Sequence, residues 1–142
     1  MREVKRSALV AQPPGVLFSI IKDVERYPEF VPGCSAARIE SRTPREIIAT
    51  LAVRRGPLRA EFTTRNELEP ERRIRMHLVR GPFRTLNGEW LLLPVASGCE
   101  VQLTMSFAFA NALAAVVFEP LFAQTVASLV DAFVKRARGA VL

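Results

Sequence analysis

Apolar and polar residues alternate with a period of two along most of the chain. A first strand is expected near Glu3 to Ala11, and the alternation runs from Arg38 onward, with interruptions at Gly56-Pro57, Pro70-Glu71 and Gly81-Pro82. Alternation bounded by glycine and proline is typical of half-buried antiparallel strands joined by tight turns. The most regular of these segments has its apolar positions at Cys99, Val101, Leu103, Met105, Phe107 and Phe109. An antiparallel sheet is therefore predicted for most of the chain.

Two segments near the N-terminus break this alternation. Pro13-Pro14 ends the first strand and suits the opening turn of a short helix, because a first helical turn does not use the backbone donor that proline lacks. Pro28 and Pro32 are expected to exclude a regular helix from Tyr27 to Cys34 and to give a tight, rigid connection. Three residues of this connection are expected to fold inward, namely Tyr27, Phe30 and Val31.

A long helix is predicted after the last strand. Asn111 suits its N-cap, and it is expected to run to about Arg138, where Gly139 can end it. Pro120 should kink or loosen this helix, and a loosened segment can serve as a gate to an interior pocket. The segment is apolar enough to raise a membrane span as an alternative, although its start alternates like a strand. The predicted inward stripe is Phe118, Phe122, Val126, Leu129, Val130 and Phe133.

The predicted register pairs opposite charges on the outer face of the sheet. Keeping all inward faces on one side places Glu69 opposite Arg73 and Glu67 opposite Arg75. Cross-strand pairs of this kind contribute about 0.2 to 1 kcal/mol each. Much of the charge is therefore expected on a solvated outer face, which weakens a nucleic-acid-binding hypothesis, and no DNA partner is expected.

Composition limits the architecture and the chemistry. With 142 residues and 49% apolar content, the chain is expected to form a single domain over residues 1–142. No signal-peptide pattern follows the charged N-terminus, so a cytoplasmic location is expected. Cys34, Cys99 and His77 are isolated, so neither a metal site nor a disulfide is predicted. Asp131 is expected in a salt bridge or facing solvent, and no catalytic residues are predicted.

Arginine dominates the positive charge. The formal net charge is +6, and 17 of the 20 basic residues are arginines. This bias favours phosphate or RNA contact, or else reflects genome composition. Hairpin geometry predicts that two Gly-Pro turns lie at one end of the sheet, where a basic patch meets a phosphate, a lipid headgroup or RNA, or is only a solvated end. The patch consists of Arg54, Arg55, Arg59, Arg80 and Arg84.

Four fragments in a fixed order are similar to one known family. On these fragments, which span nearly the whole length, the chain resembles the START-like coenzyme Q-binding proteins of the SRPBCC superfamily, whose bacterial relatives include ribosome association toxins. Arg80 departs from the pattern, since family members often carry an acid there. The fragments are Tyr27-Pro28-x-Phe30-Val31-Pro32-x-Cys34, Phe62-Thr63-Thr64-Arg65-Asn66, Gly81-Pro82-Phe83-Arg84-x-Leu86-x-Gly88-x-Trp90 and Val130-Asp131-Ala132-Phe133-x-x-Arg136-Ala137.

The resemblance implies an α+β fold of the helix-grip type (START/Bet v 1-like). In this fold a curved antiparallel sheet of about six or seven strands wraps around a long C-terminal helix and leaves an apolar tunnel. It also implies non-catalytic binding of a polyprenyl quinone such as ubiquinone, or a similar lipid, by a carrier or chaperone that supports respiration and requires no cofactor. Transient contact with a membrane surface, peripheral at the inner membrane, accompanies that hypothesis.

The residues expected to contact such a ligand are large apolar side chains on the sheet and the long helix, together with one amide. For each apolar residue a plain core role is the alternative, and the amide can instead be satisfied internally. They are Phe62, Asn66, Met76, Leu78, Trp90, Met105, Phe107, Phe109, Phe118 and Phe122.

Two other functions remain open at the level of sequence. One is a ribosome-binding toxin or regulator that blocks subunit association, which the basic patch and the toxin relatives motivate. The other is a polyketide aromatase or cyclase, which rests on fold analogy alone. No inward acid-base pair is predicted, which argues against the aromatase or cyclase.

Overall fold

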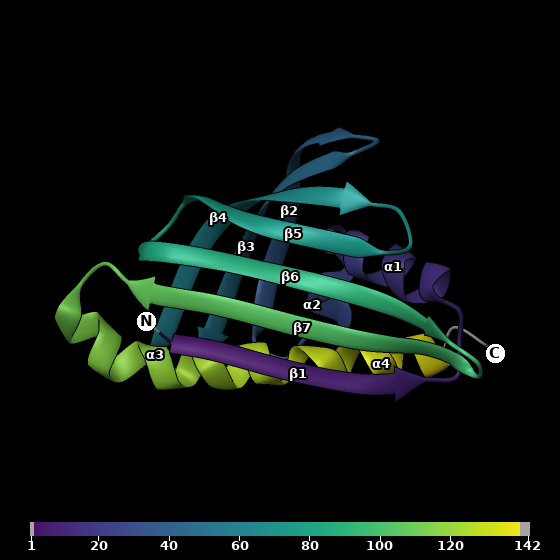
Figure 1. Cartoon of the computed structure of the whole chain (residues 1–142). Helices are drawn as coiled ribbons and strands as arrows, with labels where there is room; N and C mark the ends of the chain where they lie inside the picture. Colours follow the sequence, from purple (N-terminus) through teal and green to yellow (C-terminus); the bar gives the residue numbers. More distant parts are fainter. Residues whose placement is uncertain (1, 140–142) are drawn as a thin grey trace.

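A computed structural model describes residues 2–139 of the chain, which form one sheet and a set of helices on its inner face. The sheet has seven strands in the order β1-β7-β6-β5-β4-β3-β2, and all neighbours are antiparallel. The predicted helix-grip fold is confirmed (Figure 1). The strands are β1 (Arg2–Val10), β2 (Cys34–Thr43), β3 (Glu46–Arg55), β4 (Leu58–Glu69), β5 (Arg73–Arg80), β6 (Phe83–Val95) and β7 (Gly98–Phe109).

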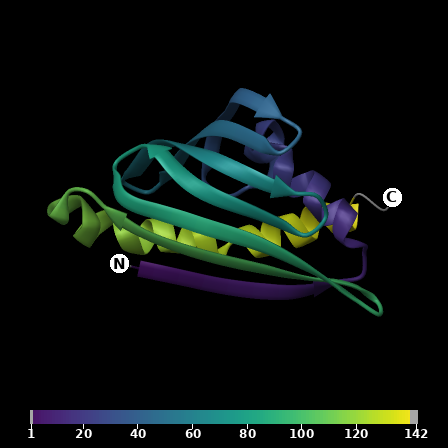
Figure 2. The ribbon, with the colours of Figure 1, turned by 45° about the horizontal axis from the view of Figure 1, so that its top comes forward.

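The helices lie along the concave face of the sheet. Figure 2 shows α3 and α4 running one after the other beneath the curved strands, with α1 near the end of α4. The helices are α1 (Pro14–Lys22), the 3-10 helix η1 (Val24–Arg26), α2 (Tyr27–Phe30), α3 (Ala112–Ala127) and α4 (Leu129–Gly139).

Two predictions about the helices differ from the structure. The segment from Tyr27 to Cys34 was expected to exclude a regular helix, yet one helical turn, α2, forms there. Pro28 is tolerated because it lies in the first turn, where its missing N–H is not needed. The long helix passes through Pro120 and is divided at Ser128, whose hydroxyl donates to Thr125 O at 2.7 Å. The predicted cap is confirmed, since Asn111 Oδ1 accepts from two backbone N–H groups.

The far end of α4 is fixed to the rest of the fold by polar contacts. Gln12, which follows β1, donates from Nε2 to Ala137 O at 2.5 Å. Arg136 forms an ion pair with Glu29 at 2.9 Å and lies 4.7 Å from the centroid of the Phe30 ring. These contacts hold α2 and α4 together, so the concave face is covered along its length.

The predicted register between β4 and β5 is confirmed, but one ion pair differs. Glu69 lies opposite Arg73 and pairs with it at 2.6 Å, as predicted. Glu67 also lies opposite Arg75, yet its carboxylate contacts Arg65 and His77 instead. Side chains on one strand can reach neighbours on their own strand as well as across the ladder, so register alone does not decide ion pairing.

The turn between β5 and β6 packs tightly against β4. Gly81 has a φ of +153°, and a Cβ added to it would lie 2.6 Å from the Cβ of Phe62. The turn between β3 and β4 is open by contrast, because a Cβ on Gly56 (φ +56°) would meet nothing within 4 Å. Glycine is therefore required at position 81 for close packing as well as for backbone geometry.

Replacing these two glycines separates backbone strain from packing. Gly56→Ala should cost about 1 kcal/mol through backbone strain alone. Gly81→Ala should cost about 3 kcal/mol, because the new methyl group also displaces the backbone of β4. Urea unfolding followed by circular dichroism measures both free energies, and equal losses for the two variants would contradict this packing.

Candidate functional site

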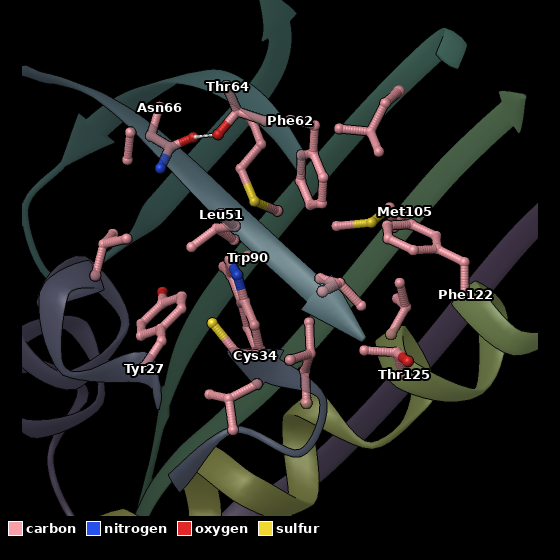
Figure 3. Close-up of a pocket in the computed structure, with 18 of the residues that line it drawn as sticks. Tyr27, Cys34, Leu51, Phe62, Thr64, Asn66, Trp90, Met105, Phe122 and Thr125 are labelled. Carbon is pink, nitrogen blue, oxygen red and sulfur yellow. Dashed lines mark hydrogen bonds between the residues drawn. The ribbon is translucent and has the colours of Figure 1, made fainter. Parts of the chain in front are cut away.

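An apolar cavity lies between the concave face of the sheet and the helices (Figure 3). Its volume is about 70 Å³. Its walls come from β2 to β7, from α3 and α4, and from the segment that carries η1 and α2. The lining residues are Val24, Tyr27, Val31, Cys34, Ala49, Leu51, Val53, Phe62, Thr64, Asn66, Met76, Leu86, Trp90, Met105, Phe122, Thr125, Val126, Leu129 and Phe133.

Aromatic rings close the cavity at two ends. At one end the Phe133 ring lies 5.2 Å from Tyr27 and 5.0 Å from Trp90, measured between centroids. At the other end Phe62 and Phe122 are 5.7 Å apart in an edge-to-face arrangement. Figure 3 shows Tyr27 on one side of the space, and Phe62 and Phe122 on the other. Rings at both ends give the cavity rigid limits, since aromatic pairs favour defined geometries.

The middle of the cavity is lined by flexible side chains. Gly88 lies on the inward face of β6, and a Cβ there would meet Met76 Cε at 2.6 Å and Met105 Cε at 3.1 Å. The two methionine methyl groups thus fill the space that Gly88 leaves without a side chain. Methionine is unbranched and adapts readily to irregular shapes. This part of the cavity can therefore change its shape without moving the backbone.

One amide supplies a polar group inside the cavity. Asn66 is 9% exposed, and its Oδ1 accepts a hydrogen bond of 2.8 Å from the Thr64 hydroxyl. Figure 3 shows the Asn66 nitrogen on the side of the amide away from Thr64. A buried amide nitrogen favours an acceptor as its partner. The cavity therefore offers a donor to a ligand that carries a carbonyl oxygen.

Two titratable groups in the lining, Tyr27 and Cys34, are held in their neutral forms. The Tyr27 hydroxyl donates to Ile21 O, and burial raises the pKa of this phenol far above its usual range. Burial also raises the pKa of the Cys34 thiol. Neither group carries a charge at neutral pH, so the lining suits an uncharged guest. Asp131 is exposed on α4 and is not among the cavity residues.

The structure divides the predicted ligand contacts into two groups. Phe62, Asn66, Met76, Trp90, Met105 and Phe122 line the cavity. The remaining four lie elsewhere. Phe107 and Phe109 belong to the aromatic packing around Phe122, at centroid distances of 4.8 and 6.1 Å. Leu78 and Phe118 are partly buried against the core.

Several lining residues were not among the predicted contacts. They come from the segment that carries η1 and α2 and leads into β2, from β3, β4 and β6, and from the helical pair on both sides of Ser128. The inward folding predicted for Tyr27 and Val31 and the inward stripe through Phe133 were usable indications, but the residues of β3 read as plain core. The additional lining residues with the clearest indication in the sequence are Tyr27, Val31, Val126, Leu129 and Phe133.

The five arginines of the predicted basic patch have different surroundings in the structure. Arg80 pairs with Glu40, and this hydrogen bond lowers the pKa of Glu40, so Arg80 is neutralised. Arg55 donates from Nε to Gln124 Oε1 at 3.3 Å. Arg54 and Arg59 lie directly opposite each other on β3 and β4, and both are exposed. Within residues 2–139, no carboxylate oxygen lies within 4 Å of a side-chain nitrogen of Arg54, Arg59 or Arg84, so these arginines have no ion pair there.

Comparison with known proteins identifies both a family and relatives. A family model described as "Polyketide cyclase / dehydrase and lipid transport" matches residues 10–134. The ribosome association toxin RatA of Pseudomonas aeruginosa is 40% identical over 136 residues, which cover 95% of this chain and 94% of that protein. The mitochondrial coenzyme Q-binding protein COQ10 of Drosophila melanogaster is 26% identical over 127 residues, or 86% of this chain and 52% of that protein.

Solved structures share the fold at low sequence identity. The Zhui aromatase/cyclase from Streptomyces sp. R1128 superposes with a TM-score of 0.88 at 20% identity, over 99% of this chain and 96% of the other. A START superfamily protein from Mycobacterium smegmatis gives a TM-score of 0.81 at 20% identity, over 97% and 98% of the two chains. At this level of identity the similarity shows the fold.

The buried phenol of Tyr27 predicts a loss of stability at high pH. The unfolded phenol ionises near pH 10, while burial raises the pKa of the folded phenol above that value. The contribution of Tyr27 is therefore complete below about pH 10 and falls by about 1.4 kcal/mol per pH unit above it. Because Tyr27 is the single tyrosine, phenolate absorbance in the near ultraviolet should appear only as the protein unfolds.

Tyr27→Phe is the control for this prediction. The variant should lose about 1 to 2 kcal/mol at neutral pH, because Ile21 O loses its donor. Above about pH 10 its free energy of unfolding should also fall less steeply than that of the wild-type protein, because the variant has no phenol to ionise at position 27. Phenolate absorbance in the folded wild-type protein near pH 10 would contradict the burial of this group.

Proposed function

The chain belongs to the polyketide cyclase / dehydrase and lipid transport family, and we propose that it binds a polyprenyl quinone in the cavity as a non-catalytic carrier or chaperone. The observation that carries the proposal is an apolar cavity that contains a single amide, Asn66, beside Thr64. A quinone combines an apolar tail with carbonyl oxygens that accept hydrogen bonds. The relative from Drosophila melanogaster is named a coenzyme Q-binding protein, which also supports this ligand class.

Burial of the tail supplies enough free energy for binding. Each buried methylene contributes about 0.8 kcal/mol, so a five-carbon isoprenyl unit contributes roughly 3 to 4 kcal/mol. Association itself costs at least about 4 kcal/mol. Three buried units contribute about 9 to 12 kcal/mol and therefore leave a net value of about 5 to 8 kcal/mol, whose upper end corresponds to micromolar affinity.

Binding requires the cavity to widen. Its volume of about 70 Å³ is well below the roughly 300 to 1,000 Å³ of pockets that enclose small molecules. The methyl groups of Met76 and Met105 occupy the space beside Gly88, and they can move by rotation of side-chain torsions. The ligand is thus expected to displace these methyl groups while the aromatic rings at the two ends keep the tail in place.

Asn66 gives the site a means of recognising the ring. Its amide nitrogen donates to a quinone carbonyl oxygen in our proposal, while its Oδ1 keeps the bond from Thr64. A neutral hydrogen bond of this kind contributes about 0.5 to 1.5 kcal/mol. Most of the affinity then resides in the tail, so a fatty acid or another lipid is expected to compete.

Trp90 provides a direct readout of binding, because it is the single tryptophan and it lines the cavity. Titration with a quinone that carries three isoprenyl units should quench its fluorescence with a dissociation constant of about 1 to 200 μM. Gly88→Val should abolish the quenching, because its side chain fills the space beside the two methionines. Asn66→Leu should weaken quinone binding about threefold to tenfold. The same substitution should have little effect on the affinity for farnesol, measured by its competition with the quinone.

Leu9→Gln is the matched control, since Leu9 is 71% exposed and lies outside the cavity. It should bind the quinone like the wild-type protein. Quenching that persists unchanged in a folded Gly88→Val variant would place the ligand elsewhere and overturn the proposal. Failure of the wild-type protein to bind any quinone, farnesol or fatty acid would overturn it as well.

A second candidate function is ribosome binding that blocks subunit association. The relative from Pseudomonas aeruginosa is named a ribosome association toxin, and it matches this chain over nearly its whole length. Arg54, Arg59 and Arg84 are exposed and offer guanidinium groups to RNA phosphates. The aromatase or cyclase alternative rests on fold similarity alone, which does not establish chemistry.

Charge reversal at the exposed arginines tests the second candidate. The combined variant Arg54→Glu, Arg59→Glu and Arg84→Glu should lose cosedimentation with ribosomal subunits and restore their association. Arg72→Glu, at the opposite end of the sheet between β4 and β5, should behave like the wild-type protein. Unchanged ribosome profiles for the triple variant would exclude these arginines from ribosome binding.

A further inference from the structure

The outer face of α3 is apolar and exposed. Leu113, Val116 and Val117 have exposed fractions of 81%, 77% and 51%. Pro120 and Gln124 continue the same face, because residues three and four apart lie on one side of a helix. Figure 1 shows the start of α3 projecting beyond the end of β7, away from the rest of the fold.

Burial in the described fold does not account for this apolar character. The helical pair Ala112–Gly139 is long and apolar enough to cross a membrane by length and composition alone. A core helix of this length and composition in a soluble protein is mostly buried, yet only 22% of the most apolar 18-residue stretch of Ala112–Gly139 is buried here. The inner side chains Phe122 and Val126 pack on the sheet, while the outer side chains lack such contacts. A helix that is apolar on both sides needs a second apolar environment.

Positively charged groups flank this face on the side of β3 and β4. Arg55 contacts the end of the face directly, since its Nε donates to Gln124 Oε1 at 3.3 Å. Arg54 and Arg59 lie beyond it, directly opposite each other in the register of the two strands. Like charges in this arrangement destabilise a sheet. An anion bound between the two arginines would offset that repulsion.

Further cations flank the face on the side of β1. A groove between β1 and α3 is lined by Pro120 and Gln124 from the helix and by Arg2 and Arg6 from the strand, together with Lys5 and Glu3, which pair with each other at 3.6 Å. Both arginines are exposed. Apolar side chains on a projecting helix, with arginines on either side, match the chemistry of a bilayer surface, where acyl chains lie beneath anionic headgroups.

We propose that the outer face of α3 docks onto an anionic lipid bilayer. Leu113, Val116 and Val117 enter the boundary between headgroups and acyl chains, and the arginines on both sides contact lipid phosphates. RNA fits this surface less well, because exposed leucine and valine offer nothing to a phosphate backbone. A second copy of the chain seated symmetrically on this face would bring two sets of arginines into one interface.

Docking in this orientation places the wall of the cavity at the membrane. Phe122 and Val126 line the cavity from the inner side of the same helix whose outer side contacts lipid. Small movements of α3 at the bilayer would therefore open a path between the acyl region and the cavity. The docking does not depend on which ligand occupies the cavity, and vesicle binding is measured separately from quinone binding.

Flotation with vesicles tests the docking surface. The wild-type protein should float with vesicles made of equal parts phosphatidylcholine and phosphatidylglycerol, and high salt should weaken this binding. The double variant Leu113→Gln and Val117→Gln should bind such vesicles about tenfold more weakly or less. The double variant Arg54→Gln and Arg59→Gln should lose the preference for phosphatidylglycerol over pure phosphatidylcholine.

Leu9→Gln and Arg72→Gln are the matched controls. Leu9 is as exposed as the α3 residues but lies at the opposite end of β1, and Arg72 lies in the turn between β4 and β5. Both controls should float like the wild-type protein, and circular dichroism should show that every variant is folded. A control that loses binding as much as the α3 variant would overturn the proposal.

The other occupants of this surface give distinct results. A wild-type protein that does not float, but forms a dimer that Leu113→Gln and Val117→Gln dissociate in light scattering, would assign the face to self-association. Cosedimentation with ribosomal subunits that requires Leu113 and Val117, without vesicle binding, would assign it to the ribosome. Either result would overturn the proposal, and neither would affect the measurement of quinone binding at Trp90.

Discussion

The mismatch between a curved sheet and straight helices is the constraint on which the rest of this structure depends. A sheet with one apolar face must cover that face, and here α3 and α4 lie across it as the cover. Because curved strands and a straight helical pair do not match along their length, large aromatic rings fill the two ends and methionines fill the middle. The cavity at Gly88 is the space that this packing leaves between the two surfaces.

The same constraint gives α3 two roles. Its inner side must be apolar because it closes the cavity through Phe122 and Val126. Its outer side is also apolar, although exposure to water favours polar residues at such positions. A helix that is apolar on both sides lies naturally between a protein interior and a lipid surface. This position would suit the proposed carrier, because a guest exchanged with the proposed bilayer surface would not have to cross water.

Charge is distributed unevenly over the outer face of the sheet. Ion pairs such as Arg73 with Glu69 and Arg80 with Glu40 neutralise much of it locally. Exposed pairs of this kind contribute little to stability. Because they neutralise charge locally, the electrostatic field of the protein comes mainly from arginines without an acidic partner. Two of these arginines within the described residues, Arg54 and Arg59, lie at the β3–β4 hairpin, and Arg55 of the same hairpin contacts Gln124 of α3, so uncompensated charge and the exposed apolar face lie side by side.

The sequence by itself determined the strands, the helix cap at Asn111 and six of the ten expected cavity contacts, because periodicity and turn residues act over short distances. Only the tertiary structure decided that Phe107 and Phe109 pack behind Phe122, that Arg80 finds Glu40, and that the helical pair breaks at Ser128 instead of Pro120. Each of these depends on residues far apart in the chain or on how the helices meet the sheet. Alternation identifies an inward face, but the curvature of the sheet decides which inward residues border open space.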